Sequence, residues 1–301
     1  MSHRLDQAFE RALAYLDQHL NEPFELQALA DIAHIPRCHF DPLFTALYHM
    51  SIDAYVELLK SLEAAHLLGF GKQVSLATIA AKLAYRNEQH FIESFTRSIG
   101  QSPESFQQAP DWGNLFAKQQ PLKSFQADVS QQSDQSYSVD IVSFDAQSLA
   151  VMEHHGDPAL LSQTIARFIE WRRQFALSPT NCRTFNLLYS SPELSAKTQY
   201  RIDIGVSLNA ETQALVSESS QIMLKSIPQG RCAMIKYSGD DIGLEAAIDY
   251  LYRDWVNAND VTLRNYPLFL ERLDINDNEL AQHQPRQALH PQQVLIYLPV
   301  V

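Results

Sequence analysis

The stretch from Ser75 to Phe106, SLATIAAKLAYRNEQHFIESFTRSIGQSPESF, decides the fold of the first third of the chain. Ser75 and Asn87 can each cap a helix, because a short polar side chain accepts a hydrogen bond from a free backbone N–H. Gly100 can end the second helix in the left-handed conformation, and Ser102–Pro103 can open another helix. Two short helices meeting at a tight turn form a helix-turn-helix.

Helical spacing also predicts what this motif buries. The first helix repeats apolar residues on one face, at Leu76, Ile79, Ala80 and Leu83. The second helix is expected to bury His90, Phe91, Ser94 and Phe95. Two helices this short cannot bury much by themselves, so they need a supporting helix. The apolar segment Ile52–Leu68 supplies it.

The motif is similar to the second helix-turn-helix of AraC/XylS-type transcription regulators. The similarity rests on the spacing of Ile79, Ala80, Tyr85, Phe91, Phe95, Gly100 and Pro103, and it extends back over roughly the first hundred residues. It implies one such motif at each end of a long connecting helix, with two recognition helices in successive major grooves of double-stranded DNA. It also implies RNA polymerase as a partner.

The chain departs from this family at the positions that are usually basic. Pro42 and Thr45 replace an Arg and a Lys in the first motif, and Glu93 and Thr96 replace them in the second. Proline inside a helix costs roughly 3 kcal/mol, so the first recognition helix is expected to begin late, with Asp41 as its cap. The remaining candidate DNA contacts are Arg37 and His39 in the first motif and Arg86, Asn87, Gln89, His90 and Arg97 in the second. Plain surface solvation is the alternative for each.

The charge balance opposes a DNA-binding function. The formal net charge is −12, and residues 1–112 contain eight Lys and Arg against fourteen Asp and Glu. Affinity for the duplex comes largely from cationic side chains that neutralise phosphates. A second hypothesis therefore remains open: an effector-binding or protein-interaction module whose DNA-binding capacity is degenerate.

The length of 301 residues suggests about two domains. Residues 113–136 are rich in Gln, Ser and Asp and predict a linker between domains at 1–112 and 137–301. The sequence has no apolar run long enough to span a membrane and no signal-peptide pattern at its start. We therefore expect a cytoplasmic protein with no membrane partner.

The second half contains an internal repeat. The segments that begin at Ser148 and Arg231 each combine an alternating strand, a Gly-Asp pair and an aromatic-rich helix. Gly156 and Gly239 would allow the sharp turn from strand to helix. The expected fold is multidomain: an all-α domain with two helix-turn-helix motifs, followed by an α+β domain with a duplicated strand-helix-strand-strand unit and both helices on one face.

Residues 136–301 resemble the GyrI-like effector-binding domain through HHGD, YSGD, SIPQGRCAMIKY, PLFLERL and VLIYLPV. The resemblance implies a cleft that takes a small, hydrophobic and often cationic effector, with Glu271 as the counter-charge. The candidate walls are Trp171, Tyr189, Tyr237 and Trp255, for which core packing is the alternative. His154 and His155 point to opposite faces of a strand and cannot chelate one metal. The pattern predicts no catalytic residue, metal or cofactor and no enzyme.

Overall fold

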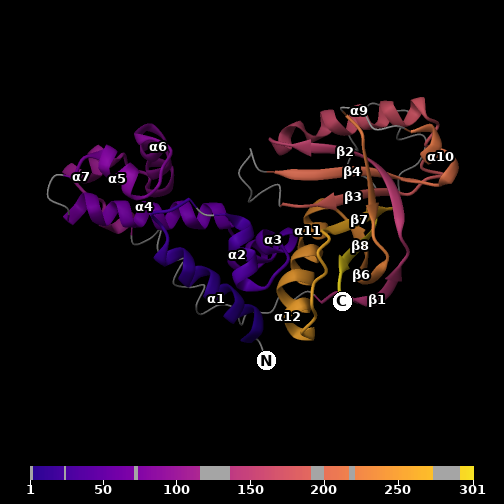
Figure 1. Ribbon diagram of the computed structural model, residues 1–301, viewed down its shortest axis with the longest axis horizontal. Coiled ribbons are helices and arrows are strands. Elements are labelled where there is room, and N and C mark those ends of the chain that lie inside the picture. Colours follow the sequence, from indigo (N-terminus) through magenta and orange to yellow (C-terminus); the bar gives the residue numbers. More distant parts are fainter. Residues whose placement is uncertain are drawn as a thin grey trace. The chain divides into compact units, whose positions relative to one another are not determined.

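The computed structural model describes residues 3–23, 25–70, 74–115, 136–190, 200–216, 221–273 and 292–301, and it forms two compact units (Figure 1). Unit 1 comprises Pro36–Ala46 and Ser133–Val301, together with residues 1–2. Unit 2 comprises His3–Ile35 and Leu47–Gln132. Most of the expected linker, residues 116–135, lies outside the described residues. The domain boundaries at 112 and 137 therefore stay predictions.

Unit 2 is built from helices, as expected. They are α1 (His3–Gln18), α2 (Leu26–Ala33), α4 (Ile52–Phe70), α5 (Leu76–Lys82), α6 (Glu88–Ile99) and α7 (Pro103–Gln108). No helix among the described residues is both long enough and apolar enough to cross a membrane. Helices α5 and α6 occupy the two segments that the capping signals predicted.

The capping predictions are confirmed. The Ser75 side chain accepts a hydrogen bond from the backbone N–H of Thr78 at 3.2 Å, and Asn87 Oδ1 accepts one from the N–H of His90 at 2.8 Å. Gly100 ends α6 with φ of 85°, a conformation that residues with a side chain rarely adopt. Phe91, Ser94 and Phe95 are buried on α6, but His90 is exposed, so its predicted burial was wrong.

Aromatic rings hold α5, α6 and α7 against the connecting helix α4. Tyr85 and Phe91 have ring centroids 5.3 Å apart, and Phe95 contacts Phe106 edge to face at 5.7 Å. All four side chains are buried in one cluster that also contains Leu62, Ala65 and Leu68 of α4. Burial of a large apolar side chain stabilises by about 1.5–3 kcal/mol. Two short helices that would be marginal alone are therefore fixed by tertiary packing.

The first recognition helix is longer than expected. Helix α3 spans Arg37–Tyr48 and contains Pro42 in its interior, so the prediction that it begins late, at Asp41, was wrong. Phe40, Leu43 and Phe44 of this helix are fully buried. Burial of these side chains outweighs the helix hydrogen bond that proline cannot donate.

Unit 1 contains one sheet of eight described strands in the order β1-β6-β8-β7-β3-β4-β2-β5. The strands are β1 (Asp140–Phe144), β2 (Gln147–His155), β3 (Thr184–Leu188), β4 (Arg201–Leu208), β5 (Met223–Ile227), β6 (Gly230–Gly239), β7 (Leu268–Arg272) and β8 (Gln292–Pro299). Its helices are η1 (Pro158–Leu160), α9 (Leu161–Gln174), α10 (Ala210–Leu215), α11 (Asp241–Tyr250), the π-helix η2 (Leu251–Trp255) and α12 (Val256–Asn259).

The predicted duplication is confirmed. The units β2-α9-β3-β4 and β6-α11-β7-β8 each form a contiguous part of the sheet, and the antiparallel pair β3–β7 joins them. Gly156 has φ of 107°, as a sharp turn requires. Gly239 is not among the glycines with positive φ, and a Cβ there would lie 2.2 Å from the Tyr237 hydroxyl, so the Tyr237 side chain would have to shift.

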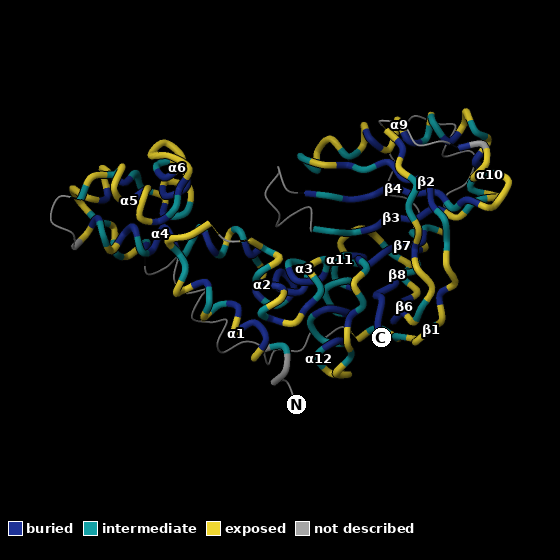
Figure 2. Tube along the Cα trace, in the orientation of Figure 1, coloured by how far each residue is buried: buried dark blue, intermediate teal, exposed yellow. Residues whose placement is uncertain are grey.

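The strand register defines two faces of the sheet. Ala150 and Met152 of β2 pack in one cluster with Phe168 of α9. Directly paired residues on neighbouring strands have their side chains on the same face. The pairs that lead from β2 through β4, β3, β7 and β8 to β6 therefore place Tyr237 on the face of Ala150 and Met152. Tyr237 packs there against α11 at Gly243. Both helices therefore cover one face, as predicted. Figure 2 shows that the central strands β3, β4 and β7 are largely buried, whereas the edge strand β1 is mostly exposed.

Candidate functional site

The candidate DNA-contacting residues at α6 are exposed. They are Arg86, Asn87, Gln89, His90 and Arg97. The cap uses the side-chain oxygen of Asn87, so its amide N–H₂ group stays available to a base or phosphate. Gln89 Nε2 instead donates to Glu93 Oε1 on the next turn at 2.7 Å. Readout by Gln89 would therefore first have to break a hydrogen bond within α6.

The acidic departures on α6 also face solvent. Glu88 and Glu93 are exposed, and Thr96 donates its hydroxyl to the carbonyl of Ile92 at 2.7 Å. Carboxylates at this surface repel phosphates, whereas Arg97 in the last turn attracts them. The helix thus combines groups suited to base readout with no net positive charge.

The two candidates on α3 differ. Arg37 is exposed, but His39 is 0% exposed within unit 1. Its Nδ1 lies 3.0 Å from the hydroxyl of Tyr252 in η2, and its Nε2 lies 2.9 Å from the backbone oxygen of Arg264. Burial lowers the pKa of His39 to about 4, so the ring is neutral at pH 7. His39 is thus a buried link between α3 and the rest of unit 1, and it has no ring nitrogen available to DNA.

The sheet face opposite α9 and α11 carries the other candidate site, and we call it the inner face. Cross-strand pairs place Val151, Phe185 and Glu271 in one row and Asp203, Leu187, Phe269 and Tyr297 in the next. Its centre is apolar, because Phe144, Phe185, Phe269 and Tyr297 pack together in one buried cluster. Charged side chains lie on both sides of this cluster.

On one side, Glu271 is fully engaged by Arg183. The guanidinium donates two hydrogen bonds, from Nε to Oε1 at 2.6 Å and from Nη2 to Oε2 at 2.7 Å. Tyr297 adds a hydroxyl donor to Oε2 at 3.3 Å. The Glu271 side chain is only 8% exposed, whereas that of Arg183 is 44% exposed. Hydrogen bonding to Glu271 raises the pKa of Arg183.

The guanidinium of Arg183 also lies over two aromatic rings. Its central carbon is 4.9 Å from the ring centroid of Phe185 and 5.4 Å from that of Phe144. The residue directly precedes β3, and its backbone N–H and C=O both hydrogen-bond to Ser207 of β4, at 2.8 and 2.9 Å. This anchoring continues the alternation of β3 and directs the Arg183 side chain to the inner face.

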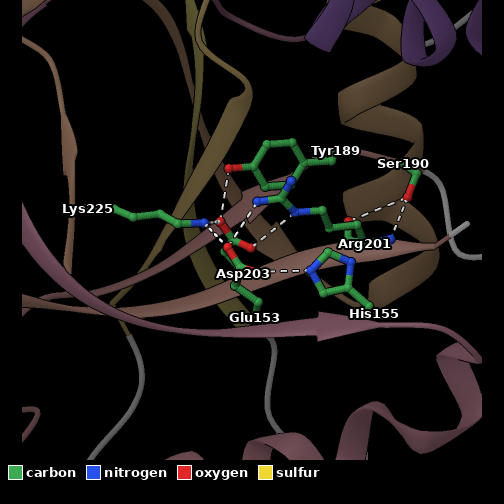
Figure 3. Close-up of polar contacts among 7 residues, drawn as sticks. All are labelled: Glu153, His155, Tyr189, Ser190, Arg201, Asp203 and Lys225. Atoms are coloured by element: carbon green, nitrogen blue, oxygen red, sulfur yellow. Dashed lines mark hydrogen bonds and ion pairs between the residues drawn. The ribbon is translucent and has the colours of Figure 1, made fainter. Parts of the chain in front are cut away.

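On the other side lies a network of charges that we call the β2–β5 network (Figure 3). It comprises Glu153, Tyr189, Arg201, Asp203 and Lys225. Figure 3 shows the carboxylates of Glu153 and Asp203 between the ammonium group of Lys225 and the guanidinium of Arg201. Lys225 bonds to both carboxylates, with 2.6 Å to Asp203 Oδ2. Arg201 lies 3.2 Å from Glu153 Oε1 and 3.5 Å from Asp203 Oδ1.

Tyr189 closes this network over its buried carboxylate. Its hydroxyl donates to Asp203 Oδ2 at 2.9 Å, and the guanidinium carbon of Arg201 lies 4.0 Å from its ring centroid. Asp203 is 0% exposed. The hydrogen bond from Lys225 lowers the pKa of Glu153 to about 2, whereas burial and the Asp203 charge raise the pKa of Tyr189. The network thus pairs two acidic side chains with two basic ones.

Of the four aromatic walls expected around Glu271, only Tyr189 shares its face. Trp171 stacks on Phe168 in the cluster beneath α9, on the face of the sheet opposite to Glu271. Tyr237 also lies on the helix face and donates to the backbone oxygen of Asp240. Trp255 lies in η2, where its backbone oxygen accepts a hydrogen bond from Asn259. The aromatic residues that do surround the Arg183–Glu271 pair are Phe144, Phe185 and Tyr297.

Sequence reasoning missed Arg183 and the β2–β5 network. A signal for part of this was present: in a strand from residue 184 to 189, the alternation puts positions 185, 187 and 189 on one face, and residue 183 continues it. The pairing of residues 183 and 271 depends on the β3–β7 register, which the sequence alone does not supply.

Comparisons with known proteins identify a domain in each half of the chain. A helix-turn-helix domain model matches residues 29–109, and the GyrI-like small molecule binding domain model matches residues 137–286. The probable transcriptional regulator YgiV of Escherichia coli (strain K12) is 24% identical over 145 residues, which cover 48% of this chain and 89% of YgiV. The HTH-type transcriptional regulator AlkR of Acinetobacter baylyi is 31% identical over 97 residues, 32% of this chain and 31% of AlkR.

A solved structure, the EcmrR C-terminal domain, aligns with 56% of this chain and 99% of its own, at 14% identity and a TM-score of 0.42.

Proposed function

We propose that this chain, which joins an AraC-type helix-turn-helix domain to a GyrI-like small-molecule-binding domain, is a transcription regulator that reads DNA through α6 and takes a small effector on the inner face. The observation that carries the DNA part is α6 itself. A capped helix, packed against α4 and α5, presents Arg86, Asn87, His90 and Arg97 to solvent. The amide N–H₂ group of Asn87, which the cap leaves available, can donate to an acceptor on a base edge, and Arg can recognise guanine or a phosphate.

The support for the effector part is the inner face. It offers aromatic rings beside hydrogen-bonded charges, which is the usual composition of a small-molecule site. Regulation by an effector requires that the effector bind the DNA-bound and free states with different affinity. RNA polymerase is the partner through which such a regulator would act.

The test of DNA binding uses the full chain. Fluorescence anisotropy with genomic fragments, including the promoter of its own gene, is measured at several salt concentrations. We expect selective binding that weakens steeply with salt. Arg97→Ala should lower the affinity and reduce the slope of log K against log salt by about one.

Arg173→Ala is the matched control for Arg97→Ala. Both arginines lie in the last turn of a helix, Arg97 in α6 and Arg173 in α9, so each substitution removes one similarly placed charge. The control should leave binding unchanged. Equal losses for the two variants would show a general charge effect and would remove α6 from the interface.

A second candidate function is an effector-binding or interaction module that no longer binds DNA. The exposed Glu88 and Glu93 on α6 and the buried His39 on α3 favour it. Absence of DNA binding by the folded full chain, even at low salt, would favour this candidate over the first.

A further inference from the structure

The Arg183 side chain contacts the kinds of group that a lipophilic cation would use. A lipophilic cation gains from a carboxylate and from the faces of aromatic rings. Here the carboxylate of Glu271 already accepts two hydrogen bonds from Arg183, and the rings of Phe144 and Phe185 already lie beneath its guanidinium. The chain therefore supplies its own cation to this site.

The β2–β5 network leaves no other carboxylate open to a cation. Glu153 and Asp203 both lie within hydrogen-bond distance of the Lys225 ammonium group, and both pair with Arg201. Each described carboxylate of β2, β4 and β7 on the inner face, namely Glu153, Asp203 and Glu271, lies within 3.5 Å of an Arg or Lys nitrogen. A cationic ligand would meet balanced charge on both sides of the aromatic cluster.

We propose that Arg183 sets the charge preference of the inner face, so that the effector is an uncharged aromatic or apolar molecule and lipophilic cations are excluded from Glu271. This inference rests on the proposed effector function of the C-terminal unit. An uncharged molecule does not compete for Glu271. A cation must break a bidentate pair and then tolerate the released guanidinium nearby, because the Arg183 backbone stays bonded to Ser207.

The test compares a charged and an uncharged probe of similar shape, for which the proposal predicts different affinities. Tetraphenylphosphonium is a lipophilic cation, and triphenylphosphine oxide is uncharged. Their dissociation constants are measured by isothermal titration calorimetry with the full chain, as wild type, as Arg183→Gln and as the double variant Arg183→Gln/Glu271→Gln. Gln keeps the three side-chain carbons of Arg but lacks the guanidinium and its charge, so it frees the Glu271 carboxylate and the rings.

We expect the wild type to bind the uncharged probe at least about tenfold more tightly than the cation. Arg183→Gln should raise the affinity for the cation by about tenfold or more and change that for the uncharged probe by less than about threefold. The double variant should abolish the gain, because no carboxylate remains. A wild type that prefers the cation, or an Arg183→Gln variant with unchanged affinity for it, would overturn the proposal.

A second comparison covers the case in which Arg183→Gln does not fold, which circular dichroism would show. If Arg183 shields Glu271 in the wild type, Glu271→Gln leaves the weak affinity for the cation within about threefold. A tenfold loss in that variant would mean that Glu271 binds cations despite Arg183, and the proposal would be wrong.

The failure of this proposal is distinct from the failure of the proposed function. Binding of the uncharged probe without any gain of cation binding in Arg183→Gln refutes the charge preference and leaves effector binding intact. Binding of neither probe to any variant refutes both the preference and the inner face as an effector site, whereas DNA binding is judged by its own assay.

Discussion

Glu153→Gln tests whether the β2–β5 network stabilises unit 1. The hydrogen bond from Lys225 lowers the pKa of Glu153 from 4.5 to about 2. Each pKa unit corresponds to about 1.4 kcal/mol, so the ionised side chain contributes at most about 3–4 kcal/mol at neutral pH. Because the side chain is 28% exposed, solvent screening reduces this value. We expect the substitution to lower the free energy of unfolding by about 1–2 kcal/mol at pH 7.

The lowered pKa of Glu153 also determines how its contribution to stability depends on pH. The pKa in the folded state is below that in the unfolded state, so the stabilisation is complete above pH 4.5 and disappears as the pH falls towards 2. The difference between wild type and Glu153→Gln should therefore fall by about half between pH 7 and pH 3. Urea unfolding followed by tryptophan fluorescence measures it, since Trp171 and Trp255 both lie in unit 1.

Glu170→Gln is the control for this experiment. Glu170 is 62% exposed and pairs with Arg173 at 3.4 Å on the same helix, so its removal should cost less than about 0.5 kcal/mol. A loss in Glu153→Gln no larger than in the control, or equal at pH 7 and pH 3, would refute a stabilising role for the network.

Three further predictions concern α3 and α6. Glu93→Lys on α6 should raise DNA affinity about fivefold or more at low salt and steepen the salt dependence by about one phosphate contact; unchanged anisotropy curves would place this surface away from DNA. Gly100→Ala forces a side chain into φ of 85° and should cost unit 2 about 1 kcal/mol in urea unfolding followed by circular dichroism, whereas no loss would show that the helix ends differently. His39 has a pKa of about 4 against 6.5 when unfolded, so its stabilisation of unit 1 is lost as pH falls from 6.5 towards 4. His39→Gln should flatten the change in the urea midpoint between pH 7 and pH 5, and an unchanged slope would contradict the burial of the ring.

Features set by short-range chemistry could be predicted from the sequence. Ser75, Asn87 and Gly100 each act within a few residues of their own helix end, and each has the predicted role. The repeated strand-helix pattern likewise predicted two equivalent halves of one sheet. These signals act between residues that are close in the sequence, so packing between distant segments does not change the structure that they predict.

Features set by packing between distant segments could not be predicted. An aromatic residue on an amphipathic helix, such as Trp171, gives no sign of which sheet face its helix will cover. His39 resembles a surface residue of a recognition helix, yet α3 buries it against Tyr252 and Arg264. Glu271 could be identified as a buried carboxylate, but its partner Arg183 is 88 positions away in the sequence. The charge state of the site depends on that partner.

In both candidate sites, a carboxylate accepts a hydrogen bond from another side chain of the protein, and this decides how ligand binding should respond to substitution. On α6, Glu93 accepts a hydrogen bond from Gln89, and on the inner face Glu271 accepts two from Arg183. A ligand for either site exchanges one hydrogen-bond partner for another, and a hydrogen bond to a charged group contributes only about 1.5–3 kcal/mol net. Removal of the internal partner abolishes that cost. Arg183→Gln and Glu93→Lys should therefore both increase binding, of a cation and of DNA respectively, which substitutions that merely damage a site do not do.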